Sequence, residues 1–368
     1  MELSDLIRDS IKRLTPYSPG KDSEEAKREF GLEEIIKMAS NENPLGPSLR
    51  AIAAICAAAP DVFLYPDPTW RELVLALSAK FEMPAETIVV GRGSDDIIHM
   101  AGLALLEPDS EVVFSDPPFA LYPLTAAHCG CQAVAVPHKD LAHDLERIAA
   151  ACTDKTRLVF LSNPYNPTGT IFTQREVDRF LADVPETAVV VLDEAYFEYH
   201  DAPDYPRSLE YVREGRPVIV LRTFSKIYAL AGLRVGYGFM PEVLADGLKR
   251  ACAPFNVSTL ALAAAQASLE DESQVRRSQQ MVWEGKAYLY REFERLGLEY
   301  VPTQANFIFL DTGIHSRTCF DGLIRRGVTI RTGDIFGLPT WIRVTVGTKE
   351  HNEAFVEKLG EVLEACEI

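Results

Sequence analysis

The sequence predicts an α/β fold with a mostly parallel central sheet, helices on both of its faces, and a smaller α+β domain. From about residue 87, short apolar runs rich in β-branched residues alternate with helical patterns, an order typical of parallel sheets. The runs are apolar on both faces, so helices should cover both sides of the sheet. The predicted strands are 87–91, 111–116, 132–137, 157–163, 188–194, 218–223 and 235–240.

After residue 250 the pattern changes. Long helical stretches lead into three apolar runs, "ANFIFLD", "GVTIRTG" and "WIRVTVGT", which are separated by helices and turns. We therefore expect residues 1–40 to form an N-terminal arm and part of the small domain, residues 41–250 the large domain, and residues 251–368 the small C-terminal domain. A chain of 368 residues is long enough for two such domains.

Charge and hydropathy exclude several classes of protein. The formal net charge is −17, so the protein lacks the basic face that binding to nucleic acid or an anionic membrane requires. No stretch reaches the roughly 20 apolar residues of a membrane span. The first segment, "MELSDLIRDSIKRL", is acidic and has no apolar signal region, so we expect a cytoplasmic protein. An apolar stripe in it (Leu3, Leu6, Ile7 and Leu14) indicates an arm that packs on a partner.

The cysteines and histidines give no sign of a metal site or of a disulfide framework. There are seven cysteines, an odd number, and no two have C-x-x-C spacing. The seven histidines are dispersed, and none belongs to an H-E-x-x-H motif. We therefore expect reduced thiols and no bound metal.

Four of the predicted strands end in polar or glycine-rich segments. These are "GRGSDD", "NPYNPTG", "DEAY" and "TFSK". Ligands of open α/β sheets bind beyond the carboxyl ends of the strands, so these segments should line one site. Gly91 and Gly93 allow backbone amides to point at an anion at the start of a helix. Hydroxyls of Thr223 and Ser225 and the guanidinium of Arg234 can bind the same anion, which predicts a phosphate site.

Two charged residues complete this predicted site. Asp193 ends an apolar strand, and a buried carboxylate is costly unless it is paired, either with a structural arginine or with a protonated ring nitrogen. Lys226 follows the next strand and is suited to forming a Schiff base with an aldehyde. A phosphate, a protonated ring nitrogen and an aldehyde occur together in pyridoxal 5′-phosphate, which is the predicted cofactor.

These motifs resemble those of a known family over nearly the whole chain. "NPYNPTG", "DEAY", "TFSK…GLRVGYG" and "WIRVTVGT" resemble the fold-type I pyridoxal-phosphate-dependent aminotransferases. Within them, "PYSPGK", "MASNENPLGPS", "YPDP", "GRGSDDII" and "FNVSTLALAAAQASL" are most similar to histidinol-phosphate aminotransferases. The resemblance implies transfer of an amino group from L-histidinol phosphate to 2-oxoglutarate in histidine biosynthesis.

The resemblance also implies roles for individual residues around the cofactor. Lys226 would hold the cofactor covalently and move the proton, and Asp193 would keep the ring nitrogen protonated. Asn166 and Tyr196 would contact the phenolic oxygen, and Phe119 would stack on the ring, where many relatives have tyrosine. The residues implied at the phosphate are Gly93, Ser94, Thr223, Ser225, Arg234 and, from the neighbouring subunit, Tyr65. The implied assembly is therefore a homodimer with shared active sites.

At the substrate end, the resemblance implies that Arg343 binds the α-carboxylate of glutamate and that Asn306 lies close to it. Tyr17 and Arg331 would line the same end. Each of the last two has a structural alternative: Tyr17 could be a packing aromatic, and Arg331 could pair with Asp334.

Three other functions remain open at this point. An aromatic amino-acid aminotransferase and a threonine-phosphate decarboxylase would use the same cofactor residues. The cofactor site therefore does not distinguish them from a histidinol-phosphate aminotransferase. A cofactor-binding regulator without catalysis would need a DNA-binding module and a basic surface. The acidic charge argues against that third possibility.

Overall fold

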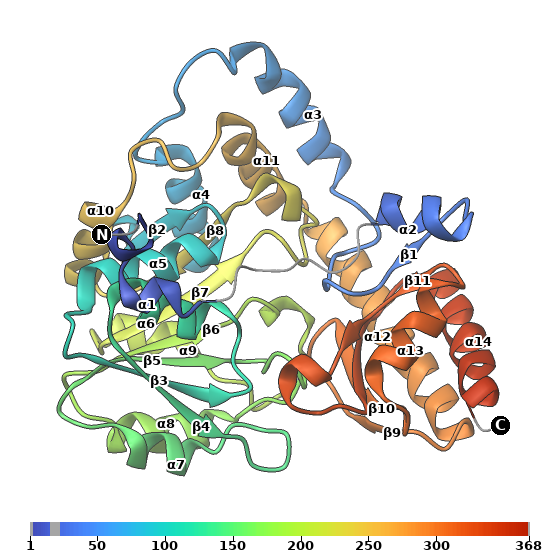
Figure 1. Cartoon of the computed structure of the whole chain (residues 1–368). Coiled ribbons are helices and arrows are strands. Elements are labelled where there is room, and N and C mark those ends of the chain that lie inside the picture. The colour runs from blue at the N-terminus through green and yellow to red at the C-terminus, as the bar shows by residue number, and fades with distance from the viewer. Residues whose placement is uncertain (1–2, 15–22, 367–368) are drawn as a thin grey trace.

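A seven-stranded sheet forms the centre of the larger part of the molecule (Figure 1) in a computed structural model that describes residues 3–14 and 23–366. The strand order is β2-β8-β7-β6-β5-β3-β4. The pairs from β7 across to β4 are all parallel, and β8 runs antiparallel to both of its neighbours. The strands are β2 (Ile88–Gly91), β3 (Glu111–Asp116), β4 (Gln132–Pro137), β5 (Thr156–Ser162), β6 (Val189–Asp193), β7 (Val218–Thr223) and β8 (Gly236–Phe239). The predicted mostly parallel sheet is confirmed.

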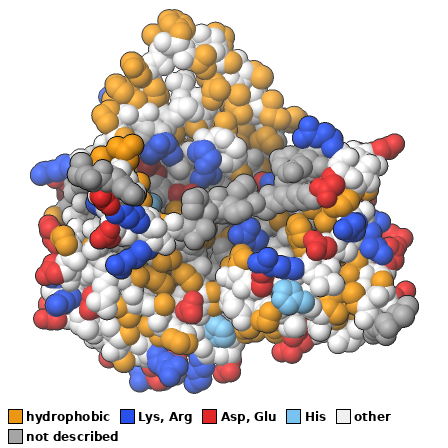
Figure 2. Space-filling model, in the orientation of Figure 1, with side chains coloured by type: hydrophobic (Ala, Val, Ile, Leu, Met, Phe, Trp, Pro, Cys, Tyr) orange, Lys and Arg blue, Asp and Glu red, His pale blue; other side chains and the backbone are white. Residues whose placement is uncertain are grey.

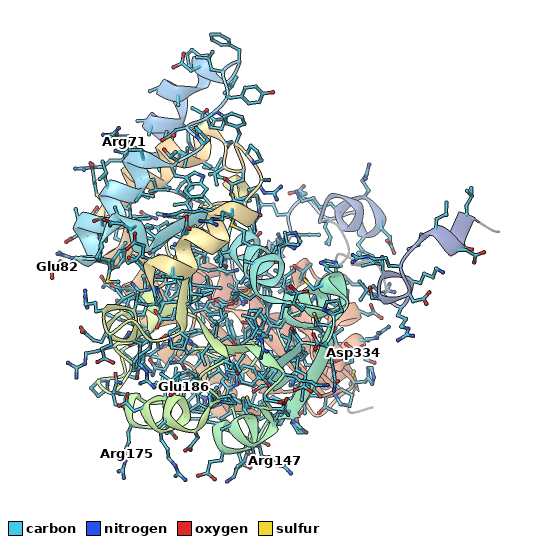
Figure 3. The ribbon with its side chains drawn as sticks, turned by 90° about the vertical axis from the view of Figure 1, so that its left-hand side faces the viewer. Arg71, Glu82, Arg147, Arg175, Glu186 and Asp334 are labelled. Carbon is cyan, nitrogen blue, oxygen red and sulfur yellow. The ribbon has the colours of Figure 1, made fainter. Side chains whose placement is uncertain are left out.

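Helices cover both faces of this sheet (Figure 1). α5 and α6 lie on one face and α7 and α8 on the other, while α10 packs against α5 and β2. The helices of this part are α3 (Leu49–Ala58), α4 (Arg71–Phe81), α5 (Ser94–Leu105), α6 (Leu121–Cys129), α7 (Leu145–Ala151), α8 (Gln174–Asp183), α9 (Ser208–Arg213), α10 (Glu242–Ala251) and α11 (Thr259–Leu269). Figure 3 shows Arg147 on α7 and Arg175 on α8 pointing away from the sheet.

The central strands are buried along their whole length. Every residue of β6 and β7 is buried, because helices cover both faces of the sheet. Burying each apolar side chain here contributes roughly 1.5–3 kcal/mol. The polar residues Asp193 and Thr223 stand at the last positions of these two strands, at the edge where ligands bind in such sheets.

The smaller part of the molecule contains an antiparallel sheet of order β12-β13-β10-β9. β1 (Ile36–Lys37) pairs in parallel with β11, so a segment from the N-terminal part of the chain joins this side. The other elements are α2 (Ser23–Phe30), α12 (Glu272–Arg295), β9 (Glu299–Val301), β10 (Phe307–Asp311), α13 (Ser316–Ile324), β11 (Val328–Thr329), β12 (Arg331–Thr332), β13 (Trp341–Thr345) and α14 (Lys349–Cys366). The domain boundaries given above stay predictions.

α3 stands away from the sheet at the top of Figure 1 and packs against α11. Its surroundings expose large apolar side chains, visible as orange atoms at the top of Figure 2. They are Leu49, Ile52, Val62, Phe63, Leu64 and Tyr65. The short helix α1 (Asp9–Lys12) lies near α6, and the side chains of Leu3, Leu6 and Ile7 before it are exposed.

Neither a membrane span nor a metal cluster is found in the part of the chain that the structure describes. No helix among residues 3–14 and 23–366 combines the length and the hydropathy needed to cross a membrane. In the same residues, no group of three or more His, Cys, Asp and Glu side chains is arranged to hold a metal ion.

Candidate active site

The polar strand ends meet around one cavity of about 430 Å³ at the carboxyl edge of the large sheet. The ends of β5, β6 and β7 and the start of α5 all contribute to its wall, as parallel strands require. The predicted site residues that line it are Ser94, Phe119, Asn166, Asp193, Tyr196, Thr223, Ser225, Lys226 and Arg234. Residues far apart in the sequence are thus brought together at the predicted place.

One end of the cavity is suited to an anion. Gly93 has a φ of 84° and precedes α5, whose first residue is Ser94, so the positive end of the helix dipole faces the cavity. A φ of 84° is a backbone conformation that residues with a side chain rarely adopt, which explains why glycine stands there. Arg234 donates hydrogen bonds to Ala231 O at 3.0 Å and to Asp95 Oδ2 at 3.0 Å. These contacts fix the guanidinium beside the helix N-terminus.

Asp193 lines the same cavity and is buried. Its carboxylate accepts hydrogen bonds from Tyr122 Oη at 2.9 Å and from the amide of Ala195 at 3.2 Å. Burial raises the pKa of Asp193 to about 6. The alternative of a salt bridge to a structural arginine is not what the structure shows, because Arg222 binds Glu194 instead.

Lys226 projects into the same cavity from the segment after β7. Its Nζ donates a hydrogen bond to Ser40 O at 2.9 Å and lies 5.6 Å from the centre of the Tyr196 ring. Burial is the main cause that lowers the pKa of Lys226 to about 8, and the charge of Arg343 adds to it. A lysine with a lowered pKa in a cleft is a candidate nucleophile and general base.

A second cavity of about 500 Å³ adjoins the first and contains two arginines. Arg331 on β12 and Arg343 on β13 are register partners in antiparallel strands, so they lie side by side. Arg343 donates hydrogen bonds to Asn166 Oδ1 and, at 3.0 Å, to Ala39 O. Burial lowers the pKa of Arg343 to about 10. Asn166, Tyr196 and Lys226 line both cavities.

The structural alternative for Arg331 was an ion pair with Asp334. The Asp334 carboxylate instead pairs with Arg317. Asp334 begins the short 3-10 helix Asp334–Phe336, whose Ile335 and Phe336 line the second cavity. Figure 3 labels Asp334 on the side of the smaller domain.

Three predicted residues remain, and the two of them that the structure describes, Tyr65 and Asn306, line neither cavity. Tyr65 is 82% exposed and stacks on Phe255 with 4.6 Å between ring centres. Asn306 is buried and donates a hydrogen bond from Nδ2 to Asn41 O at 3.1 Å. Tyr17 lies outside the described residues. The roles of all three stay predictions.

Sequence reasoning missed several residues that shape the site. Tyr122 donates to Asp193, and Asn41 donates from Nδ2 to Tyr196 Oη at 3.0 Å. Glu42 lines the first cavity and pairs with Lys37 at 2.7 Å. Tyr122 could have been found, since it follows Phe119 by three residues at the start of a helix. Asn41 gave no such signal.

The sheet and its cavity are those of an α/β enzyme. The hydrogen-bond donors and charged groups that line the cavity fit a phosphorylated aromatic aldehyde. The sequence pattern of the family "Aminotransferase class I and II" matches residues 33–359. The chain is 51% identical over 358 residues to histidinol-phosphate aminotransferase from Moorella thermoacetica, covering 97% of this chain and 92% of that protein. It is 45% identical over 366 residues to histidinol-phosphate aminotransferase from Akkermansia muciniphila, covering 99% and 100%. The chain therefore belongs to the class I and II aminotransferases.

A solved structure agrees with this assignment. Histidinol-phosphate aminotransferase from Sinorhizobium meliloti, in complex with pyridoxal-5′-phosphate, matches with a TM-score of 0.90 and 28% identity, covering 98% of each chain. The resemblance to the fold-type I aminotransferases that the motifs indicated is thus confirmed.

Proposed function

We propose that the protein transfers the amino group of L-histidinol phosphate to 2-oxoglutarate, with pyridoxal phosphate as cofactor, and forms imidazole-acetol phosphate and L-glutamate. The observation that carries this proposal is the pair of arginines, Arg331 and Arg343, beside the cavity that contains Lys226. The 51% and 45% identity to relatives named histidinol-phosphate aminotransferase supports the same substrate.

The residues of the first cavity fit this cofactor. When bound, pyridoxal phosphate supplies an aldehyde carbon for the substrate amine and a ring that accepts electrons. The hydroxyls of Thr223 and Ser225, the start of α5 and the guanidinium of Arg234 would bind its phosphate. Asp193 would hold a proton at the ring nitrogen, since a buried carboxylate is stabilised by a cationic partner.

Three further residues would hold the cofactor ring in the plane set by the contacts at its phosphate and its ring nitrogen. They are Phe119, Asn166 and Tyr196. Phe119 lines both cavities and offers a ring face for stacking. Asn166 and Tyr196 offer an amide and a phenol for an oxygen on the ring. Asn41 holds the Tyr196 hydroxyl through its hydrogen bond, so this phenol does not need to reorganise on binding.

Lys226 is the group that would accept the proton from the substrate carbon. With the pKa of Lys226 lowered to about 8, part of the amine is neutral near neutral pH and can act as a base. Ser40 O holds Nζ at the junction of the two cavities. The amine would therefore reach both the cofactor and the donor.

The arginine pair would serve both half-reactions. Glutamate and 2-oxoglutarate bring carboxylates to this end of the cavity, and histidinol phosphate brings a phosphate. A planar guanidinium can bind either group through two parallel hydrogen bonds, which an ammonium group cannot do. Asn166 and Ala39 O already orient the Arg343 guanidinium.

Tyr65 supports a homodimer with shared active sites. Its exposed ring belongs to the apolar surface around α3, and such a patch on a protein of this kind marks a contact with another chain. Mixing an inactive Lys226→Ala chain with an inactive Tyr65→Ala chain should restore activity in heterodimers. No recovery after proven subunit exchange would contradict the shared site.

The proposed substrate is tested by comparing amino donors at a fixed concentration of 2-oxoglutarate. Histidinol phosphate should give a higher kcat/KM than phenylalanine, tyrosine or histidine. If phenylalanine or tyrosine equals it, the protein is an aromatic aminotransferase. Release of carbon dioxide from threonine phosphate would instead indicate a decarboxylase.

A further inference from the structure

Tyr122 contacts both Asp193 and Phe119, two residues of the cofactor site on which the proposed function depends. The residue is buried on α6, and its hydroxyl donates a hydrogen bond to Asp193 Oδ2 at 2.9 Å. Its ring stacks on Phe160 with 4.5 Å between centres and an angle of 4°. It also meets Phe119 edge-on, at 5.6 Å and 75°. One side chain therefore contacts the proposed partners of both the ring nitrogen and the ring face.

Of the described side chains, only that of Tyr122 donates a hydrogen bond to Asp193. The second donor is the backbone amide of Ala195. Among the described residues, the other titratable groups that interact with Asp193 are Asp95, Glu194, Tyr196 and Tyr205. The two carboxylates disfavour its charge, and Glu194 is itself paired with a buried arginine. The Tyr122 hydroxyl is thus the side-chain group that favours the charged form of Asp193.

We propose that Tyr122 is a positioning residue that keeps Asp193 ionised, so that a proton shared with the ring nitrogen of bound pyridoxal phosphate stays on the nitrogen. This inference rests on the proposed function. A hydrogen bond to a carboxylate stabilises its charged form, whereas burial does the opposite. Without the Tyr122 hydroxyl, the shared proton moves toward Asp193. A ring that has lost its positive charge accepts electrons poorly, so the reaction slows.

Two properties of Tyr122 suit this role. Burial and the neighbouring Asp193 charge raise the pKa of Tyr122 well above its usual value, so the phenol stays protonated and remains a donor. The stack on Phe160 fixes the ring, so the hydroxyl is directed at Asp193 before the cofactor binds. Phenylalanine at this position would keep the stack and lose only the hydroxyl.

The test uses the holoenzyme loaded with pyridoxal phosphate labelled with ¹⁵N in the ring, because the ¹⁵N chemical shift distinguishes a protonated from a neutral ring nitrogen. The wild type should show the protonated value. Tyr122→Phe should move the shift toward the neutral value and lower kcat by about ten- to a hundredfold. The KM for the donor should change much less, because the donor does not touch this residue.

Tyr237→Phe is the matched control. Tyr237 is a buried tyrosine of β8 whose hydroxyl has no hydrogen-bond partner in the described part of the chain. Its replacement should leave the ¹⁵N shift at the wild-type value. In an Asp193→Asn background, Tyr122→Phe should cause no further shift, because its effect passes through the carboxylate.

The outcomes separate this inference from the proposed function. A Tyr122→Phe holoenzyme with the wild-type shift and kcat overturns the role of Tyr122 and leaves the transaminase standing. A wild type that takes up no labelled cofactor overturns the proposed function itself. If Tyr122→Phe does not bind the cofactor, Tyr122→3-fluorotyrosine tests the role of the Tyr122 hydroxyl instead. Its stronger hydroxyl donor keeps Asp193 ionised, so the ¹⁵N shift should stay at the protonated value, and a move toward the neutral value overturns the inference.

Discussion

The two walls of the active site differ in how they are built and in what they can select. The wall of the large sheet combines Asp193 and Thr223 at the ends of parallel strands with Arg234 beside a helix N-terminus. The wall of the small sheet carries Arg331 and Arg343 on neighbouring antiparallel strands. The first wall has groups for a cation and for an anion, and the second has two cations. This difference indicates that the first wall fits a cofactor and that the second wall fits an anionic substrate.

The electrostatics support this division. Neither Arg331 nor Arg343 forms an ion pair with a carboxylate among the described residues, and burial lowers the pKa of Arg343. A buried cation without an anionic partner is costly, so such a residue is a candidate for binding an anionic ligand.

Replacing Lys226 tests the covalent centre where the walls meet. Lys226→Ala should lower kcat by more than about 10³-fold, because it loses the nucleophile as well as a proton transfer worth about 10²–10⁴-fold. Borohydride reduction of the wild type, followed by mass spectrometry, should find the cofactor on Lys226. Attachment to any other lysine would remove this residue from its proposed role.

Asp193→Asn tests the large-sheet wall alone. An amide can still hydrogen-bond the ring nitrogen but cannot stabilise a positive charge. Losing one member of a buried charge pair costs about 3–5 kcal/mol, so kcat should fall by about 10²–10⁴-fold. Cofactor binding, followed by absorbance, should weaken much less than kcat. Near wild-type turnover with full cofactor occupancy would make Asp193 structural.

The parts of this site that the sequence predicted are those fixed by topology. Asp193, Thr223 and Lys226 could be placed together because parallel strands end at one edge of the sheet. The spacing to Phe119 could have pointed to Tyr122, but its contact with Asp193 could not be predicted, because Asp193 lies 71 residues further along the chain on another element. The same holds for Asn41, whose contact with Tyr196 joins two segments that are 155 residues apart in the sequence. Hydrogen bonds of this kind depend on packing that no local pattern encodes.

The seven strands were predicted nearly to the residue for a related reason. The inner strands lie between helices on both faces of the sheet, so each is a continuous apolar run bounded by turn residues, whereas the edge strand β4 is mostly exposed. The proposed contribution of Tyr65 cannot be placed from one chain, because its ring is exposed and lines neither cavity.

The buried Asp193 carboxylate of the large-sheet wall should lower the free energy of unfolding of the cofactor-free protein. The pKa of Asp193 is raised from 3.8 to about 6 in the folded state. Between these values the folded state holds a proton that the unfolded state releases, so wild-type stability falls as the pH rises from 4 to 6. Asp193→Asn removes this loss and should be more stable above pH 6, by up to about 3 kcal/mol.

Thermal unfolding of both cofactor-free proteins measures this difference in stability. The gain in Tm of Asp193→Asn should grow between pH 4.5 and 6.5 and then stay constant, following the raised pKa of about 6. A gain that does not depend on pH would assign the effect to packing and not to the buried charge.

The most direct test of the division between the two walls is the ratio of kcat/KM for histidinol phosphate to kcat/KM for phenylalanine, measured in the wild type and in Arg331→Ala. Hydrogen bonds to a charged group contribute about 1.5–3 kcal/mol each, so the ratio should fall by about ten- to a hundredfold in the variant. Tyr237→Phe, which alters neither wall, should keep the wild-type ratio. An unchanged ratio in Arg331→Ala would contradict the claim that the small-sheet wall selects the phosphorylated donor.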